Sequence, residues 1–288
     1  MHEKVFPEIP LDEAEFYAKV SARNASLLSK VNSVEEVDPL LIDTMIFRCL
    51  VRLLRTPKPY EFLRPKNLWV SSVYTCLCEW DAYSHLSPVR GKKILEAGGT
   101  GLAAIQFMLA GAREAWLLTP VASEADYATE VARLAGVKVN CRVGVAEEMP
   151  FAPNTFDAVY TGGCLHHFKI PTALAEISRV LVAGGRFSAV EPWQAPFYCT
   201  GIKLFGKMEP VNCKPLNAKR MMGVGEGFSS FKVVHHGTLT RYPALALFKL
   251  GIPISLGVSW YMTKIDDIIA SLLMIRKYGS CVAVLAEK

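Results

Sequence analysis

Short apolar runs alternate with helical segments between residues 92 and 192 of this 288-residue chain, and this alternation constrains the fold more than any other feature. The runs end in Gly, Pro or an acidic residue, which is typical of strands. They cover residues 92–98, 114–119, 137–144, 156–162 and 185–192, and the helical segments between them cover 103–111, 123–136 and 171–185. Strands that alternate with helices of this length form a parallel sheet joined by right-handed crossovers. The sequence therefore predicts an α/β fold with helices on both faces of the sheet.

The rest of the chain predicts additions to this unit. Helical spacing at 11–31, 38–55 and 67–86 predicts an N-terminal helical cap over residues 1–90, which leaves 91–288 as the sheet-forming domain. Two further strands are expected at 229–239 and 280–288. Insertions are expected at about 192–228 and at 244–275, the second of them a hydrophobic helical segment.

Composition narrows the classes of partner. Hydrophobic residues make up 51% of the chain and charged residues 20%, so we expect a folded protein rather than a disordered one. The net charge of +5 is modest and dense Lys/Arg blocks are lacking, which argues against a nucleic-acid partner and favours a small or lipid-like one. Eight scattered cysteines indicate a reducing compartment, and the acidic start does not predict a secretory signal, so we expect a cytoplasmic location. No cysteine spacing predicts a metal site.

The segment 94–101 reads ILEAGGTG and places a glycine-rich turn between the first strand and the next helix. Such a turn lets a ligand approach the backbone and the unpaired N–H groups of the helix start. Glycines also end strands for conformational reasons alone, so the turn by itself is weak evidence. Three segments follow in order and strengthen it: GVAEEMPF at 144–151, NTFDAVYTGGCLHHF at 154–168 and AEISRVLVAGGRFSAVEP at 175–192.

This ordered series resembles the class I S-adenosylmethionine (SAM) dependent methyltransferases, in the branch that includes quinone and small-molecule methyltransferases. The resemblance covers residues 92–193, and 282–288 is similar to the family's last, antiparallel strand. It implies a Rossmann-like fold with a mostly parallel seven-stranded sheet, SAM as the cofactor, and methylation of a small, apolar acceptor at O, N or C. The implied cofactor residues are Glu96, Gly98, Gly99 and Gly101 for the methionyl end, Val145, Ala146 and Glu147 for the adenine, and Thr161 and Gly162 for the methionine moiety and the sulfonium.

The sequence departs from the family pattern at three points. The turn is one residue short, Thr119 stands where an acid usually binds the ribose, and Val145 stands where an acid often binds the adenine amino group. Glu124 or Asp126 is placed to supply the missing carboxylate. These departures leave two alternatives to methyl transfer: a lyase or cyclase that attacks the aminocarboxypropyl arm of SAM and releases methylthioadenosine, and a non-catalytic scaffold that kept the fold.

Two pairs of histidines invite a functional interpretation. His166 and His167 are candidates for a general base because imidazole titrates near neutrality, although capping or packing at a helix start is the preferred explanation. The sequence does not separate the two. His235 and His236 lie in an expected strand and are interpreted as structural.

Aromatic and basic residues outside the main unit also have two explanations each. Tyr74, Trp80 and Tyr83 could cover the sulfonium by cation–π contact, but at helical spacing they are expected to be core residues. The segment 201–220 has one acid, Glu209, and a surplus of bases near the apolar stretch 244–260, which would suit an anionic membrane surface. A solvated loop and a buried lid helix are preferred over membrane contact. The bases are Lys203, Lys207, Lys214, Lys219 and Arg220.

Overall fold

The computed structural model describes residues 13–37, 76–196, 214–250, 252 and 254–288. The predicted helix at 38–55 and Tyr74 lie outside these ranges, as do Lys203, Lys207 and Glu209. The N-terminal helical segment that is described consists of α1 (Glu13–Leu28), a short turn η1 (Val34–Glu36) and α3 (Cys76–Leu86).

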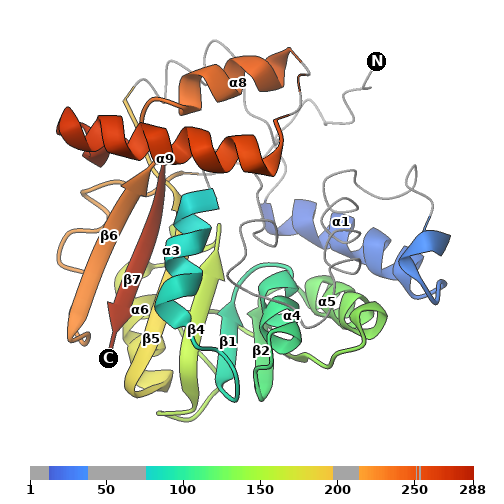
Figure 1. Ribbon diagram of the computed structural model, residues 1–288. Helices are drawn as coiled ribbons and strands as arrows, with labels where there is room; N and C mark the ends of the chain where they lie inside the picture. The colour runs from blue at the N-terminus through green and yellow to red at the C-terminus, as the bar shows by residue number, and fades with distance from the viewer. Residues whose placement is uncertain (1–12, 38–75, 197–213, 251, 253) are drawn as a thin grey trace.

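The described residues form one seven-stranded sheet in the order β3-β2-β1-β4-β5-β7-β6 (Figure 1). The first five strands are parallel, and β7 is antiparallel to both of its neighbours. Each predicted strand is present, and the Rossmann-like fold is confirmed. The strands are β1 (Lys93–Ala97), β2 (Glu114–Thr119), β3 (Asn140–Val143), β4 (Phe156–Gly162), β5 (Leu181–Pro192), β6 (Ser230–His236) and β7 (Cys281–Glu287).

Helices cover both faces of the sheet and bury a separate core on each. Helices α3, α4 (Leu102–Leu109) and α5 (Ala122–Ala135) lie on one face, and α6 (Ile170–Val180) lies on the other (Figure 1). Consecutive strand residues alternate between these cores, so that Ile94 joins the first and Leu95 the second. Helix α1 packs on the outside of α5, where Ser123 Oγ donates to the carbonyl of Ala18 at 2.9 Å.

Two C-terminal helices lie across the end of the sheet toward which the parallel strands point (Figure 1). They are α8 (Arg241–Lys249) and α9 (Leu256–Leu272), and a short turn η4 (Arg276–Tyr278) leads from them into β7. Among the described residues, no helix combines the length and the apolar character needed to span a membrane.

The expected helix at 171–185 is wrong over its last residues. Helix α6 ends at Val180, and β5 begins at Leu181, which pairs with Phe156 of β4. Gly184 has a φ of +70°, a conformation that ends a helix, and its N–H donates to the carbonyl of Lys288 at 3.0 Å. Leu and Val fit either element, so the pairing with neighbouring strands decides which one forms here.

Candidate functional site

The loops after β1 and β4 meet where the strand order reverses. Strand β1 lies between β2 and β4, and ligands of such sheets bind at this switch point, beyond the carboxyl ends of the strands. A Cβ atom on Gly98 would lie 2.8 Å from the Cβ of Cys164, which is closer than real Cβ contacts. Glycine at position 98 therefore allows the two loops to touch.

The shortened turn is built from glycines in the left-handed region. Gly98, Gly99 and Gly101 have φ values of +78°, +89° and +80°. A Cβ atom on Gly101 would also lie 2.5 Å from the Cβ of Ala128, so this glycine lets the start of α4 pack closely on α5. The turn thus closes with one residue fewer because its backbone takes conformations that other residues rarely adopt.

Glu96, the last acid of β1, turns its carboxylate toward the start of α4. It accepts the N–H of Gly101 at 3.2 Å and that of Ala104 at 2.6 Å, and only 5% of the residue is exposed. Burial raises the pKa of Glu96 to about 8, although these backbone hydrogen bonds lower it in part. The carboxylate thus occupies the anion-binding helix terminus, and its remaining lone pairs are available to a cation.

Glu124 supplies a carboxylate at the end of β2. The buried Thr119 hydroxyl donates to this carboxylate and accepts the N–H of Val121 at 3.1 Å. Burial raises the pKa of Glu124, while Asp126 lies exposed on the same helix. Of the two acids considered from the sequence, the structure therefore brings Glu124 to Thr119.

The segment after β3 is fixed to α6 by its polar groups. Glu147 accepts the N–H of Lys169 at 2.7 Å, and Glu176 accepts the N–H of Met149 at 2.7 Å. Within this segment Ala146 is buried, whereas Val145 is 45% exposed. An exposed apolar side chain on a held loop is available to a flat apolar ligand.

The end of β4 has a buried hydroxyl without a partner. Thr161 is fully buried, and within the described part of the chain its Oγ1 makes no hydrogen bond. Ser188 Oγ and Thr238 Oγ1 are likewise buried without a partner among the described residues, so what singles out Thr161 is its position at the switch point. Gly162 and Gly163 beside it are exposed, and a Cβ atom on Gly163 would meet nothing within 4 Å.

Glu191, at the end of β5, is a site residue that the sequence interpretation did not assign. Its fully buried carboxylate accepts the N–H of Cys164 at 3.0 Å and that of Leu165 at 2.8 Å, and it lies 2.6 Å from Nδ1 of His166. His167 is exposed, so the structure separates the two histidines. The sequence feature that could have assigned Glu191 to the site is its position as an acid near the end of an expected strand, like that of Glu96 in β1.

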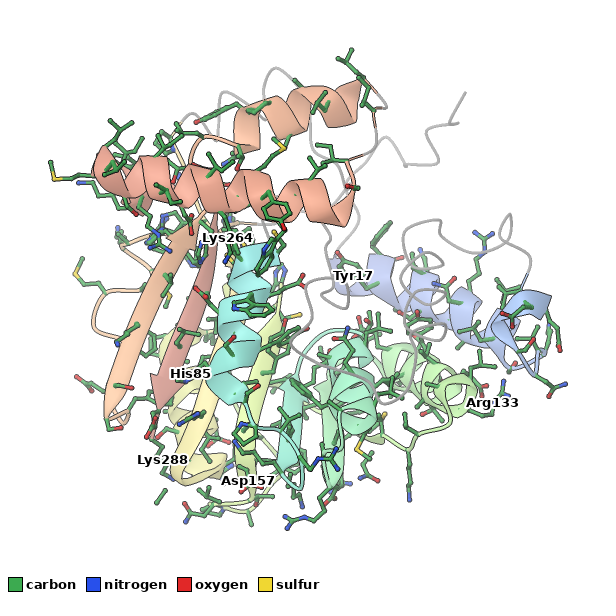
Figure 2. All side chains as sticks on the ribbon, in the orientation of Figure 1. Tyr17, His85, Arg133, Asp157, Lys264 and Lys288 are labelled. Carbon is green, nitrogen blue, oxygen red and sulfur yellow. The ribbon has the colours of Figure 1, made fainter. Side chains whose placement is uncertain are left out.

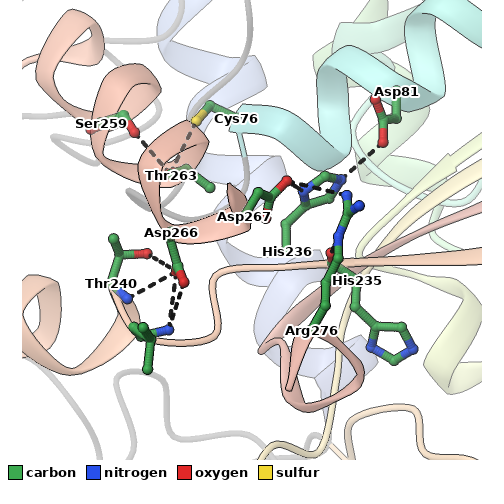
Figure 3. Close-up of polar contacts among 11 residues, drawn as sticks. Cys76, Asp81, His235, His236, Thr240, Ser259, Thr263, Asp266, Asp267 and Arg276 are labelled. Carbon is green, nitrogen blue, oxygen red and sulfur yellow. Dashed lines mark hydrogen bonds and ion pairs between the residues drawn. The ribbon is translucent and has the colours of Figure 1, made fainter. Parts of the chain in front are cut away.

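The other residues with two explanations take structural positions. Tyr83 is 2% exposed and donates to Oε1 of Gln106 at 3.1 Å, and the Trp80 ring lies edge-on against Trp260 with centroids 5.0 Å apart. His236 lies between Asp81 and Asp267, at 2.9 and 2.6 Å (Figure 3). These contacts confirm the core interpretation for Trp80, Tyr83 and His236.

Comparison with known proteins agrees with this arrangement. Residues 95–189 match the family described as methyltransferase domain, a range that includes every cofactor residue expected from the sequence. Residues 95–189 are therefore a methyltransferase domain, and this part of the chain is similar to the class I SAM-dependent methyltransferases. The ubiquinone/menaquinone biosynthesis C-methyltransferase UbiE of Dinoroseobacter shibae is 39% identical over 117 residues, which cover 38% of this chain and 46% of that protein. This chain therefore matches less than half the length of that relative.

Two further proteins extend the comparison. A demethylmenaquinone methyltransferase of Symbiobacterium thermophilum is 43% identical over 54 residues, covering 18% of this chain and 22% of that protein. The solved structure of the [4+2]-cyclase SpnF superposes with a TM-score of 0.50 at 20% identity, over 74% of this chain and 79% of the other. At that identity the similarity shows the shared fold alone.

Proposed function

We propose that this chain transfers a methyl group from SAM to a small, apolar acceptor. The main support is the Glu96 carboxylate, which holds the glycine turn and the start of α4 at the switch point, beside the unpaired, buried hydroxyl of Thr161. Both features lie within the range that matches the methyltransferase domain family. A cationic ligand with hydrogen-bonding groups would pair with the Glu96 carboxylate and the Thr161 hydroxyl.

The residues at this edge fit SAM group by group. The Glu96 carboxylate suits the ammonium of the methionyl end, and the paired Thr119 and Glu124 suit the ribose hydroxyls. Val145 and Ala146 would contact the adenine ring, while Glu147 fixes their loop to Lys169. The residues that would surround the methionine moiety are Gly98, Gly99, Gly101, Thr161 and Gly162.

SAM supplies an activated methyl group when bound, so the protein needs mainly to orient the acceptor and exclude water. Where the acceptor must lose a proton, we assign the base to His166 rather than His167. The Glu191 carboxylate beside Nδ1 holds a proton on that nitrogen and fixes the orientation of the ring. A carboxylate that orients an imidazole in this way is a recurring feature of base catalysis.

Two observations support a class of acceptor: the names of the relatives and the position of helices α8 and α9. The names of the relatives refer to quinone biosynthesis, and helices α8 and α9 lie across the same edge of the sheet as the proposed site (Figure 1). An aromatic, lipid-soluble acceptor is the class we propose. Absence of a nucleic-acid partner and a cytoplasmic location remain predictions from the sequence.

The experiment is incubation of the purified protein with SAM, with and without a demethylated short-chain quinone held in its reduced hydroquinone form, because the acceptor must be nucleophilic to take the methyl group of SAM. Methyl transfer predicts S-adenosylhomocysteine and a methylated hydroquinone in equal amounts, with release of one proton, only when the hydroquinone is present. Methylthioadenosine formed from SAM alone would contradict the proposal and indicate attack on the aminocarboxypropyl arm. Denatured protein controls for chemical breakdown of SAM.

A further inference from the structure

Helix α9 turns most of its large apolar side chains outward. Trp260 is buried against Trp80, but the other buried residues of the helix are polar or small: Ser259, Thr263, Asp266 and Ala270. The outward residues Val258, Tyr261, Ile265, Ile268 and Leu272 are 50 to 78% exposed. A surface helix of a globular protein normally buries its apolar stripe, so the pattern of α9 is reversed.

Hydrogen bonds hold α9 in this orientation (Figure 3). Asp266 accepts the N–H of Leu239 at 3.0 Å, and the N–H and hydroxyl of Thr240 at 2.9 and 2.6 Å. One turn earlier, the Cys76 thiol of α3 lies 3.7 Å from the Thr263 hydroxyl, which donates to the carbonyl of Ser259 at 2.8 Å. Rotating the helix to bury its apolar stripe would break the bonds of Asp266 with Leu239 and Thr240 and the Cys76–Thr263 contact, and it would expose the buried Asp266 carboxylate.

The apolar surface continues beyond both ends of the helix. Leu250 and Ile252 precede α9 and are 72 and 48% exposed, so the expected burial of the segment 244–260 is wrong at these residues and at Val258. Leu273 and Met274 follow it and are 58 and 85% exposed. Large apolar side chains exposed in such number on one helix and its flanking residues are uncommon on monomers and mark sites of contact with a partner or a membrane. We call this surface the α9 face: Leu250, Ile252, Val258, Tyr261, Ile265, Ile268, Leu272, Leu273, Met274 and Tyr278.

The charges at the α9 face have one sign. Lys264 and Lys277 are exposed, and Nζ of Lys264, which is labelled in Figure 2, lies 5.0 Å from the centroid of the Trp260 ring. The two carboxylates of the helix point inward, where Asp266 is buried and Asp267 binds His236 and Arg276. A second copy on this face would place like charges together, whereas an anionic surface would be complementary. Tyr and Lys, with polar tips on apolar stems, suit the boundary between lipid and water.

We propose that the α9 face rests on an anionic lipid bilayer, with α9 lying in the plane of the interface. Docking in this way covers the reversed stripe without any change in the fold. Figure 1 places α9 at the carboxyl end of the parallel strands, so docking would bring the switch-point loops close to lipid-soluble molecules. The docking itself does not depend on the proposed methyl transfer.

Vesicle flotation with the full chain tests this inference. Phosphatidylcholine vesicles are compared with vesicles that also contain phosphatidylglycerol, and binding is expected to be stronger to the second. The double variant Ile268→Glu with Leu272→Glu should bind at least about tenfold more weakly, since two apolar contacts become charges. The double variant Lys264→Ala with Lys277→Ala should lose about fivefold per lysine on phosphatidylglycerol vesicles and little on phosphatidylcholine.

Val143 is the matched control, because it is apolar, 54% exposed and on β3, at the opposite edge of the sheet from β6. Val143→Glu should bind vesicles as the wild type does. Circular dichroism checks that each variant is folded. Equal binding by wild type and the Ile268→Glu, Leu272→Glu variant would overturn the inference. Absence of vesicle binding by the wild type would also overturn it. In that case, a dimer detected by sedimentation and abolished by the Ile268→Glu, Leu272→Glu variant would assign the α9 face to contact between two copies of the chain.

Discussion

Nδ1 of His166 lies 2.6 Å from a carboxylate oxygen of Glu191, and both residues are buried at the carboxyl edge of the sheet. The same carboxylate accepts backbone N–H groups of Cys164 and Leu165. One acidic residue at the end of β5 therefore fixes both the turn after β4 and the orientation of an imidazole. Cys164, in the turn after β4, lies against Gly98 of the glycine turn. Glu191 therefore connects β5 to the glycine turn through Cys164.

The histidine pair gives the first prediction. Replacing His166 with Gln should lower kcat by about 100-fold, because the proposed base is lost while the cofactor contacts remain. His167→Gln should keep kcat within about threefold of wild type, since this neighbouring ring is exposed and lacks the Glu191 contact. Steady-state kinetics measures both, with SAM affinity and unfolding followed in parallel. A His166→Gln protein with reduced stability but unchanged kcat would assign a purely structural role to the pair.

Thr161 gives a prediction that separates stability from binding. Thr161→Val keeps the shape and removes a buried hydroxyl that has no partner in the described structure, so the free energy of unfolding should stay the same or rise by about 1 kcal/mol. Affinity for S-adenosylhomocysteine should fall by about tenfold if this hydroxyl contacts the ligand. Thr119→Val is the matched control, because its hydroxyl is paired with Glu124 and its loss should cost about 1 to 3 kcal/mol of stability. Weakened folding of Thr161→Val would argue against an unsatisfied hydroxyl.

Glu96 predicts how binding depends on pH. Burial raises the pKa of this carboxyl group to about 8, so the free protein holds a proton there at neutral pH. An ammonium group beside it favours the ionised form, so binding must release this proton below about pH 8. Affinity for S-adenosylhomocysteine should therefore rise by up to about tenfold per pH unit from about pH 6 and level off near pH 8. Titration calorimetry in buffers of different ionisation enthalpy counts the proton, and Glu96→Gln should abolish both the release and the slope. A flat profile in the wild type would contradict the assignment.

His236 predicts how stability depends on pH. Burial alone lowers the pKa of His236, but its hydrogen bonds to Asp267 and Asp81 outweigh that effect and raise the pKa to about 9. A group whose pKa is raised from 6.5 stabilises the folded state below about pH 6.5, and this contribution is lost as the pH rises through about 9. The difference in unfolding free energy between wild type and His236→Gln should be about 3 kcal/mol near pH 6 and shrink toward pH 9. Urea denaturation across this range measures it. A difference that grows with pH would show that the imidazole is neutral in the folded state.

The sheet was predictable from the sequence because its signals are local. Runs of apolar residues that end in Gly or an acid specify strands without reference to the rest of the chain, and the same pattern located Glu96 and the glycine turn. The boundary at Leu181 was not predictable, because Leu and Val suit both helix and strand and the choice rests on pairing with Phe156. The partner of Thr119 was limited to two acids by spacing, and tertiary packing selected Glu124.

Two other features depend wholly on tertiary contacts. Glu191 acts on residues 164–166 only because β5 lies beside β4 in the sheet, and no spacing in the sequence links them. Helix α9 has the periodic apolar residues of an ordinary core helix, so its pattern specifies a stripe without specifying which way the stripe faces. The contacts of Asp266 with Leu239 and Thr240 set that direction.

Binding of the SAM nucleoside at the carboxyl edge between β1 and β4 is measured by titration calorimetry with S-adenosylhomocysteine near pH 8. We expect saturable binding at one site per chain with a Kd of about micromolar order, and loss of at least about tenfold in the Glu96→Gln variant. Absence of binding by both S-adenosylhomocysteine and SAM at about millimolar concentration would contradict it and favour a scaffold that kept the fold.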